Sequence, residues 1–133
     1  MYRVFVYGSL LKGMGNHPLL KDSKCIGTTI SPEGFDMIDL GYFPGVLQND
    51  ESIGKVIGEV YEVDDDTLRR LDCLEGFDSN NPHNGMYNRI TIETELGNAY
   101  IYTYNNRHGR ITDFVPNGDW RSYYKTKMNA YSL

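Results

Sequence analysis

Residues 56–76, VIGEVYEVDDDTLRRLDCLEG, contain a change from strand to helix periodicity. The segment 56–63 alternates apolar side chains with small or polar ones, and a period of two is typical of a half-buried strand. From Asp64 onward the apolar residues recur at helical spacing, and aspartate is a residue type that caps helix N-termini. The acidic first turn suits the helix dipole, and Gly76 is a typical stop signal. The stretch therefore predicts a strand over 56–63 followed directly by a helix over 64–75.

Glu75 is unusual within the predicted helix because it falls on the apolar side. With Leu68 at zero and about 100° per residue, Leu71 falls at about 300° and Glu75 at about 340°. A carboxyl group in an apolar stripe faces a core or a cleft, where burial disfavours its charged form and raises its pKa. A glutamate whose pKa approaches neutrality can both accept and return a proton. Periodicity alone leaves one alternative open, a last-turn glutamate that extends into solvent or pairs with an arginine.

The start of the chain predicts a strand followed by a glycine-rich loop. Residues 2–7 are mostly apolar or aromatic, and the loop 8–15 contains three glycines. At the junction, the segment 7–10 (YGSL) places a glycine where a backbone can approach a ligand closely. The N–H groups of such a turn can bind an anion. A tight turn capped by Ser9 is the simpler alternative from these residues alone.

The rest of the chain predicts more strands than helices. Further strands are expected over 25–30, 35–40, 87–96 and 99–104, turns at 41–45 and 97–98, a helical turn over 17–21, and a second helix over 119–131. Tyr100, Tyr102 and Tyr104 share one face of the strand 99–104, where they form core or line a pocket opposite Glu75. This pattern predicts an α+β fold or a small barrel-like sheet.

Length, composition and charge exclude several classes of protein. The chain has 133 residues, the length of one domain, and its 40% apolar and 23% charged residues are typical of a globular protein. Thirteen Lys and Arg against eighteen Asp and Glu give a net charge of -5, so the basic footprint of a nucleic-acid-binding protein is missing. No apolar run approaches the ~18–20 residues of a membrane helix. Without a leader-like start, the chain is expected to be cytoplasmic.

Metal and disulfide chemistry are not expected. Cys25 and Cys73 lie far apart in the sequence and lack the spacing of metal ligands. His17, His83 and His108 fall in separate predicted loops, again without ligand spacing. We therefore expect no metal site.

Four blocks, in order along nearly the whole chain, resemble a known family. The first is VFVYGSL at 4–10. The second has two parts, GEVYEV at 58–63 and LDCLEG at 71–76. The third is MYNR at 86–89, and the fourth is GDW at 118–120. Each block alone is weak, but together they resemble the gamma-glutamylcyclotransferase-like family. The pairs KG at 12–13 and NH at 16–17 make the chain most similar to its gamma-glutamylaminecyclotransferase branch.

The resemblance implies a fold, a site and a reaction. The fold is expected to be a single α+β domain over 1–133, a mixed β-barrel with one helix carrying the catalytic Glu75 and a short C-terminal helix. The implied substrate-binding residues are Tyr7, Gly8, Ser9 and Leu10, whose backbone amides hold the α-carboxylate, together with Tyr87 and Tyr104. The implied activity is cyclisation of a gamma-glutamyl amine or amino acid to 5-oxoproline with release of a free amine. It needs no metal or cofactor.

The implied chemistry requires little beyond proton transfer. Nucleophile and electrophile belong to one molecule, so most of the entropic cost of bringing them together is avoided. The expected partner is a small gamma-glutamyl substrate, with no nucleic acid or membrane, and the protein is expected to be a monomer or weak dimer. The alternative is a non-catalytic small-molecule binding or regulatory module, because a fold alone does not guarantee activity.

Overall fold

Five strands form the main sheet of the computed structural model, which describes residues 1–82, 84–105 and 113–131. In spatial order they are β2 (Lys24–Ile30), β5 (Ile57–Val63), β1 (Tyr2–Val6), β7 (Gly97–Tyr104) and β6 (Tyr87–Thr94). β1 pairs antiparallel with β5, in a register that places Val4 opposite Tyr61, and parallel with β7. The sheet is therefore mixed, as the resemblance implies.

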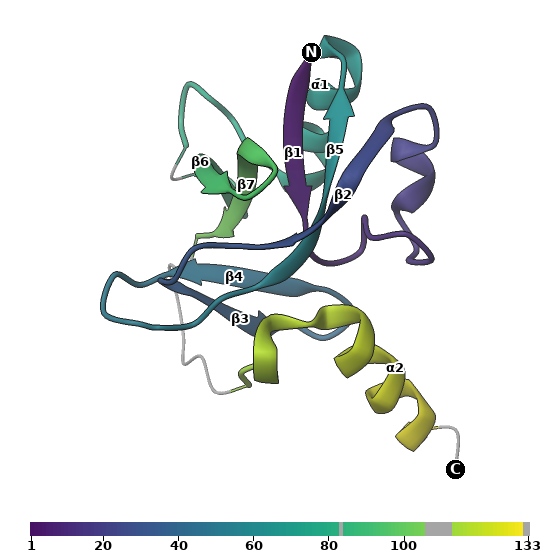
Figure 1. Ribbon diagram of the computed structural model, residues 1–133, viewed down its shortest axis with the longest axis vertical. Helices are drawn as coiled ribbons and strands as arrows, with labels where there is room; N and C mark the ends of the chain where they lie inside the picture. The colour runs from purple at the N-terminus through teal and green to yellow at the C-terminus, as the bar shows by residue number, and fades with distance from the viewer. Residues whose placement is uncertain (83, 106–112, 132–133) are drawn as a thin grey trace.

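The remaining elements lie on the two faces of this sheet. A hairpin of β3 (Phe35–Asp39) and β4 (Pro44–Gln48) forms a second, two-stranded sheet. The helices are α1 (Asp65–Glu75) and α2 (Trp120–Tyr131), with short 3-10 turns η1 (His17–Leu20) and η2 (Pro116–Gly118). Figure 1 shows α1 behind β1 and β5, the hairpin crossing below them, and α2 extending at the lower right. Neither α1 nor α2 has the length and apolar character that crossing a membrane requires.

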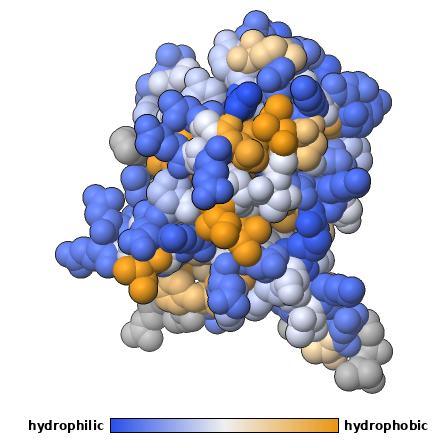
Figure 2. Space-filling view, in the orientation of Figure 1, coloured by the Kyte–Doolittle hydropathy of each residue, from blue (hydrophilic) through white to orange (hydrophobic). Residues whose placement is uncertain are grey.

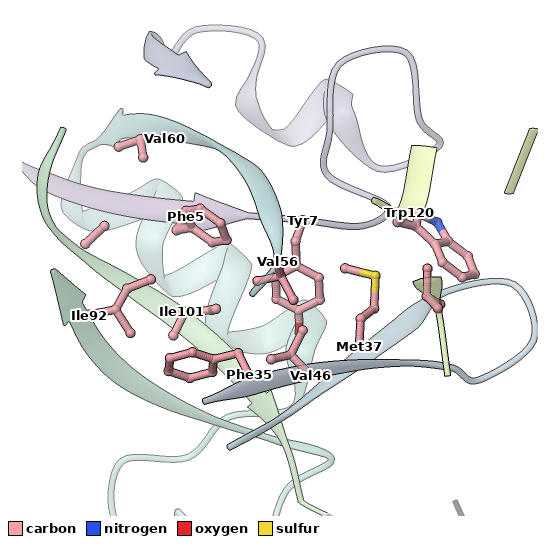
Figure 3. Packing of buried hydrophobic residues seen from close by; sticks show 12 residues of the cluster. Phe5, Tyr7, Phe35, Met37, Val46, Val56, Val60, Ile92, Ile101 and Trp120 are labelled. Carbon is pink, nitrogen blue, oxygen red and sulfur yellow. The ribbon is translucent and has the colours of Figure 1, made fainter. Parts of the chain in front are cut away.

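β1 is buried on both faces. Val4 and Val6 belong to a cluster that includes the buried leucines of α1, while Phe5 and Tyr7 belong to a second cluster on the opposite face. Figure 3 shows the second cluster, to which the hairpin contributes Phe35, Met37 and Val46 and α2 contributes Trp120. The end of β1 is therefore held by packing from two sides.

The predicted helix after β5 is confirmed at both ends. The Asp64 side chain accepts a hydrogen bond from the Thr67 N–H at 2.8 Å, which is the geometry of an N-cap. Gly76 ends the helix in the left-handed region, with φ 67°. Leu68 and Leu71 are buried, so the apolar stripe read from the sequence is the face that meets the sheet.

Strand β4 was not predicted. Residues 41–45 read as a turn because of their glycines and proline, but Pro44 and Gly45 are the first two residues of β4. Proline is tolerated at the first position of a strand, where its missing N–H breaks no ladder. Gly45 is required by close packing, since a Cβ there would lie 2.9 Å from the Tyr104 Cβ.

The fold class is the α+β class that the resemblance implies, but its mixed sheet is not closed into a barrel. β2 and β6 are the two edges of the main sheet, and β3 and β4 pair only with each other among the named strands. The hairpin meets β7 through side chains, at the contact of Gly45 with Tyr104, instead of through a hydrogen-bonded ladder. Alternation along a strand identifies its buried face, but it does not identify which edges pair.

Gly58 tests how tightly β5 packs against β1. A Cβ at this position would approach the Phe5 ring to 2.6 Å and would also meet the main-chain oxygen of Val6, and β1 has no free side toward which it can move. We expect Gly58→Ala to lower the free energy of unfolding by about 1–3 kcal/mol, measured by urea denaturation. Gly15→Ala is the control, because nothing lies within 4 Å of its added Cβ. Equal losses in the two variants would contradict this packing argument.

Candidate active site

A cavity of about 520 Å³ opens at the C-terminal end of β1. Its walls come from the end of β1 and the loop after it, the β3–β4 turn, the last turn of α1, the start of β6, β7 and α2. The volume lies in the range of about 300–1,000 Å³ that is usual for pockets binding small molecules. The cavity brings together Glu75, the segment 7–10 and Tyr87, which are distant in sequence and were predicted to form one site.

Glu75 is the last residue of α1 and lines this cavity. In the part of the chain that the structure describes, its carboxyl group has no hydrogen-bond or ion-pair partner. Burial raises the pKa of Glu75 from 4.5 to about 7. The side chain is therefore buried and pairs with none of the described arginines, and near neutral pH it exchanges readily between its protonated and ionised forms.

Two tyrosines beside Glu75 have their hydroxyl groups occupied. Tyr7 Oη donates to the main-chain oxygen of Tyr102 at 2.6 Å, and Tyr87 Oη donates to that of Pro44 at 2.7 Å. Burial, and then the charges of neighbouring groups including Glu75, raise the pKa of both phenols. They remain neutral and form a floor for the cavity without neutralising the carboxylate.

Tyr104 lies behind Tyr87 and is not among the residues that line the cavity. The two rings meet edge to face, with centroids 5.7 Å apart and an interplanar angle of 66°. Tyr100, Tyr102 and Tyr104 all pack on the α1 side of the sheet, and Tyr102 is the member that reaches the cavity. Tyr104 is therefore placed to support Tyr87, and a ligand in the cavity would not meet it directly.

The segment that follows β1 is folded into a turn with unused N–H groups. The Leu11 N–H donates to Gly8 O at 3.0 Å, and Asn16 bonds Ser9 twice, from its N–H to Ser9 O at 2.8 Å and from Nδ2 to Ser9 Oγ at 2.9 Å. The N–H groups of Gly8, Ser9 and Leu10 donate to no acceptor among the described residues. The turn lines the cavity and keeps main-chain donors available, and such donors are the groups with which nests bind anions.

Gly8 has a packing role that its sequence context did not reveal. A Cβ at this position would lie 2.6 Å from Pro44 Cγ and 2.7 Å from Pro44 Cδ. The absence of a side chain therefore lets the turn lie against the start of β4, in addition to any approach of a ligand.

Glu59 and Arg121 hold the loop after β1 and were missed from the sequence. Glu59 Oε1 accepts from the Lys12 N–H at 2.9 Å and from Tyr61 Oη at 3.0 Å, while Oε2 accepts from Arg121 at 2.8 Å. Arg121 also donates to Lys12 O at 2.8 Å. Although burial opposes ionisation, these hydrogen bonds lower the pKa of Glu59. Lys12 is thereby tied to both β5 and α2.

Asp72, one turn before Glu75, anchors the end of α1 and was also missed. It accepts from Arg89 at 2.6 Å and from Tyr102 Oη at 2.7 Å. The Arg89 guanidinium lies 4.8 Å from the Phe77 ring centroid and 4.4 Å from that of Tyr100. On the helical wheel Asp72 falls at about 40°, on the apolar side, and this signal could have identified it.

No metal centre is found among the described residues, where no three His, Cys, Asp or Glu side chains are grouped suitably. His17 Nδ1 lies 3.0 Å from Leu10 O, and its ring lies 5.7 Å from that of Tyr61. His83 and His108 lie outside the described residues. Cys25 and Cys73 are exposed free thiols.

Comparison with known proteins identifies the family. The family model described as gamma-glutamyl cyclotransferase, AIG2-like, matches residues 4–122. The chain therefore belongs to the gamma-glutamyl cyclotransferase, AIG2-like family, and this membership supports the general class of cyclotransferase enzymes.

Individual relatives cover most of the chain. A candidate gamma-glutamylcyclotransferase of Vibrio cholerae is 39% identical over 117 residues, which are 88% of this chain and 93% of that protein. The gamma-L-glutamyl-butirosin B gamma-glutamyl cyclotransferase of Niallia circulans is 32% identical over 131 residues, covering 92% of this chain and 78% of the relative. The crystal structure of an uncharacterized protein of Pyrococcus horikoshii has a TM-score of 0.74 at 24% identity, covering 99% and 98% of the two chains. At that identity the structural match shows the fold alone.

The raised pKa of Glu75 predicts a stability effect. Because the folded pKa of about 7 lies above the unfolded value of 4.5, the stability of the native chain falls as pH rises between these values. We expect Glu75→Gln to be more stable than the native chain at pH 8, by up to about 3 kcal/mol, and nearly equal to it below pH 4.5. Denaturant titrations at the two pH values measure this difference, with Glu93→Gln on the exposed side of β6 as control. A difference that does not grow with pH would contradict the burial of a neutral Glu75.

Proposed function

We propose that this chain catalyses the intramolecular cyclisation of a gamma-glutamyl amine or amino acid, releasing 5-oxoproline and a free amine. One observation carries the proposal: the carboxyl group of Glu75 and the N–H groups of the turn 8–10 lie in the same cavity, and none of them has a partner among the described residues. Family membership supports the class of reaction, and the relative from Niallia circulans is by name a gamma-glutamyl cyclotransferase.

The turn 8–10 would bind the α-carboxylate of the glutamyl group. Main-chain N–H groups are suited to this because they carry partial positive charge and cannot be neutralised by deprotonation. The bonds from Glu59 and Arg121 to Lys12 hold the same loop in place before a ligand arrives. Such preorganisation reduces the entropy lost on binding.

Glu75 would then move protons between the two nitrogen atoms of the substrate. Its carboxylate accepts a proton from the α-ammonium group, and the freed amine attacks the γ-carbonyl carbon to form the ring C–N bond. The protonated Glu75 returns its proton to the departing nitrogen as the bond between that nitrogen and the carbonyl carbon breaks. A second proton passes from the attacking to the departing nitrogen, so the products are the neutral lactam and an ammonium ion.

A carboxyl pKa near 7 suits this role. A base much weaker than Glu75 would not deprotonate the ammonium group, and an acid much weaker would not protonate the leaving nitrogen. The neutral Tyr7 and Tyr87 maintain this pKa because neither supplies a positive charge that would lower it. The rate gain from ring closure comes from the substrate itself, since the reacting groups are already joined.

Glu75→Gln should separate catalysis from binding. We expect release of 5-oxoproline to fall by at least about a hundredfold, because general acid–base catalysis contributes roughly that much or more. The panel is gamma-glutamyl-ε-lysine, gamma-glutamyl-alanine and glutathione, and substrate affinity measured by calorimetry should change little. For the native chain, kcat/KM should rise with pH through an apparent pKa of about 7, and any residual activity of the variant should lack this limb.

The control for this experiment is Glu93→Gln, a change of the same chemistry at an exposed position of β6. A native chain that binds 5-oxoproline but releases none from any compound would overturn the proposed function and favour the binding module. An acidic limb that persists in a still-active Glu75→Gln variant would show that Glu75 is not the base.

A further inference from the structure

Exposed apolar side chains gather at the mouth of the cavity. Among the described residues the large apolar side chains with high exposure are Met1, Ile30, Tyr42, Ile53, Leu74, Met86 and Phe114. Three of these line the cavity: Tyr42 is 81% exposed, Met86 52% and Leu74 43%. Figure 2 shows one face of the molecule, on which hydrophobic residues form only small patches in a mostly hydrophilic surface. Three of the seven exposed apolar side chains among the described residues therefore lie around this one cavity.

The mouth residues come from separate parts of the chain. Tyr42 and Phe43 belong to the β3–β4 turn, Leu74 directly precedes Glu75, and Met86 precedes β6. The end of α1 lies close to the segment before β6 at Gly76. A Cβ added to Gly76 would lie 3.4 Å from the Met86 main-chain nitrogen. Three segments thus supply an apolar rim beside Glu75.

The cavity offers little to a charged or hydroxylated group at this rim. Glu75 is the one Asp, Glu, Lys, Arg or His among its described lining residues. Of the polar side chains in this lining, Asn16 is bonded to Ser9, Tyr7 to Tyr102 and Tyr87 to Pro44, so the hydroxyl groups of Tyr42 and Tyr124 are the main side-chain partners left for a neutral polar group. A polar group that this rim covers would exchange water for mostly apolar surface, which costs free energy.

The direction of the substrate follows from the proposed function. The α-carboxylate is held at the turn 8–10, and Glu75 must reach the departing nitrogen. Whatever is attached to that nitrogen extends past Glu75, toward Leu74 and the rim. A cavity of about 520 Å³ also exceeds what a glutamyl group alone requires.

We infer that the leaving group is an amine whose chain is apolar and carries no charged group of its own, and that Tyr42, Phe43, Leu74 and Met86 bind that chain. This inference rests on the proposed cyclisation and adds the substrate class. It predicts that the enzyme prefers gamma-glutamyl alkylamides to gamma-glutamyl amides that end in a hydroxyl, ammonium or carboxylate group.

Three amides of equal size test the inference. They carry n-pentyl, 4-hydroxybutyl and 4-aminobutyl groups on the γ-nitrogen, so they differ only in a terminal methyl, hydroxyl or ammonium group. The polar end is remote from the reacting nitrogen, so the departing amines keep similar reactivity. We expect kcat/KM for 5-oxoproline release to be about tenfold higher for the pentyl than for the hydroxybutyl compound. Within an alkyl series, kcat/KM should rise about three- to fourfold for each methylene that becomes buried.

Variants at the rim should reduce this preference. Leu74→Gln and Met86→Gln keep similar length but replace apolar surface with an amide, so each should lower the pentyl-to-hydroxybutyl ratio at least threefold. The ratio is insensitive to partial unfolding, because both substrates are measured on the same protein. Ile53→Gln is the matched control: Ile53 is 82% exposed and does not line the cavity, so the ratio should remain at the native value.

The outcomes separate the inference from the function on which it rests. Release of 5-oxoproline with a ratio near one, or with a preference for the aminobutyl compound through the aromatic rings, would overturn the apolar leaving group and leave the cyclisation standing. Release from none of the three would count against the proposed function. In that case calorimetric affinities decide, and equal affinity for the pentyl and hydroxybutyl compounds would overturn the apolar rim as well.

Discussion

Burial of β1 on both faces is the constraint from which the site follows. Its alternate residues enter two different clusters, one shared with α1 and one shared with the hairpin and α2. The strand cannot shift, so the point where it ends is fixed relative to every layer of the fold. The chain must turn immediately after Tyr7, and Gly8 makes that turn possible against Pro44. The main-chain N–H groups of this turn consequently lie in the wall of the cavity. The other walls come from other elements of the fold.

The cavity contains polar groups that are hydrogen-bonded within the protein and polar groups that are not. Tyr7, Tyr87 and Tyr102 are each committed to a hydrogen bond within the protein, so they shape the floor and remain neutral. Glu75 and the N–H groups of the turn 8–10 have no such commitment among the described residues. Unpaired groups in a partly buried site destabilise a fold, and they persist where a ligand uses them. This contrast within one cavity supports the proposal that the cavity is the active site.

The sequence was most informative where local rules act. The helix 65–75, its cap and its stop were predictable because capping chemistry and the spacing of leucines are local properties. Glu75 was predictable for the same reason, since its place on the wheel puts it beside Leu71. Long-range pairing was not predictable: the open sheet, strand β4 and the bond of Glu59 to Arg121 join segments whose proximity no local pattern encodes. Tyr104 lies between these two cases. The sequence predicted the face of the sheet on which Tyr104 lies, but it did not predict that Tyr104 stands behind Tyr87 and outside the cavity lining.

Trp120 gives the molecule an optical property. It is the chain's single tryptophan, it is completely buried, and its indole N–H has no hydrogen-bond partner among the described residues. Its ring stacks on that of Tyr124, with centroids 5.2 Å apart, and Tyr124 lines the cavity. An indole in such dry surroundings emits at short wavelength, and a molecule that displaces Tyr124 changes those surroundings. The protein therefore carries its own fluorescent reporter one ring away from whatever occupies the cavity.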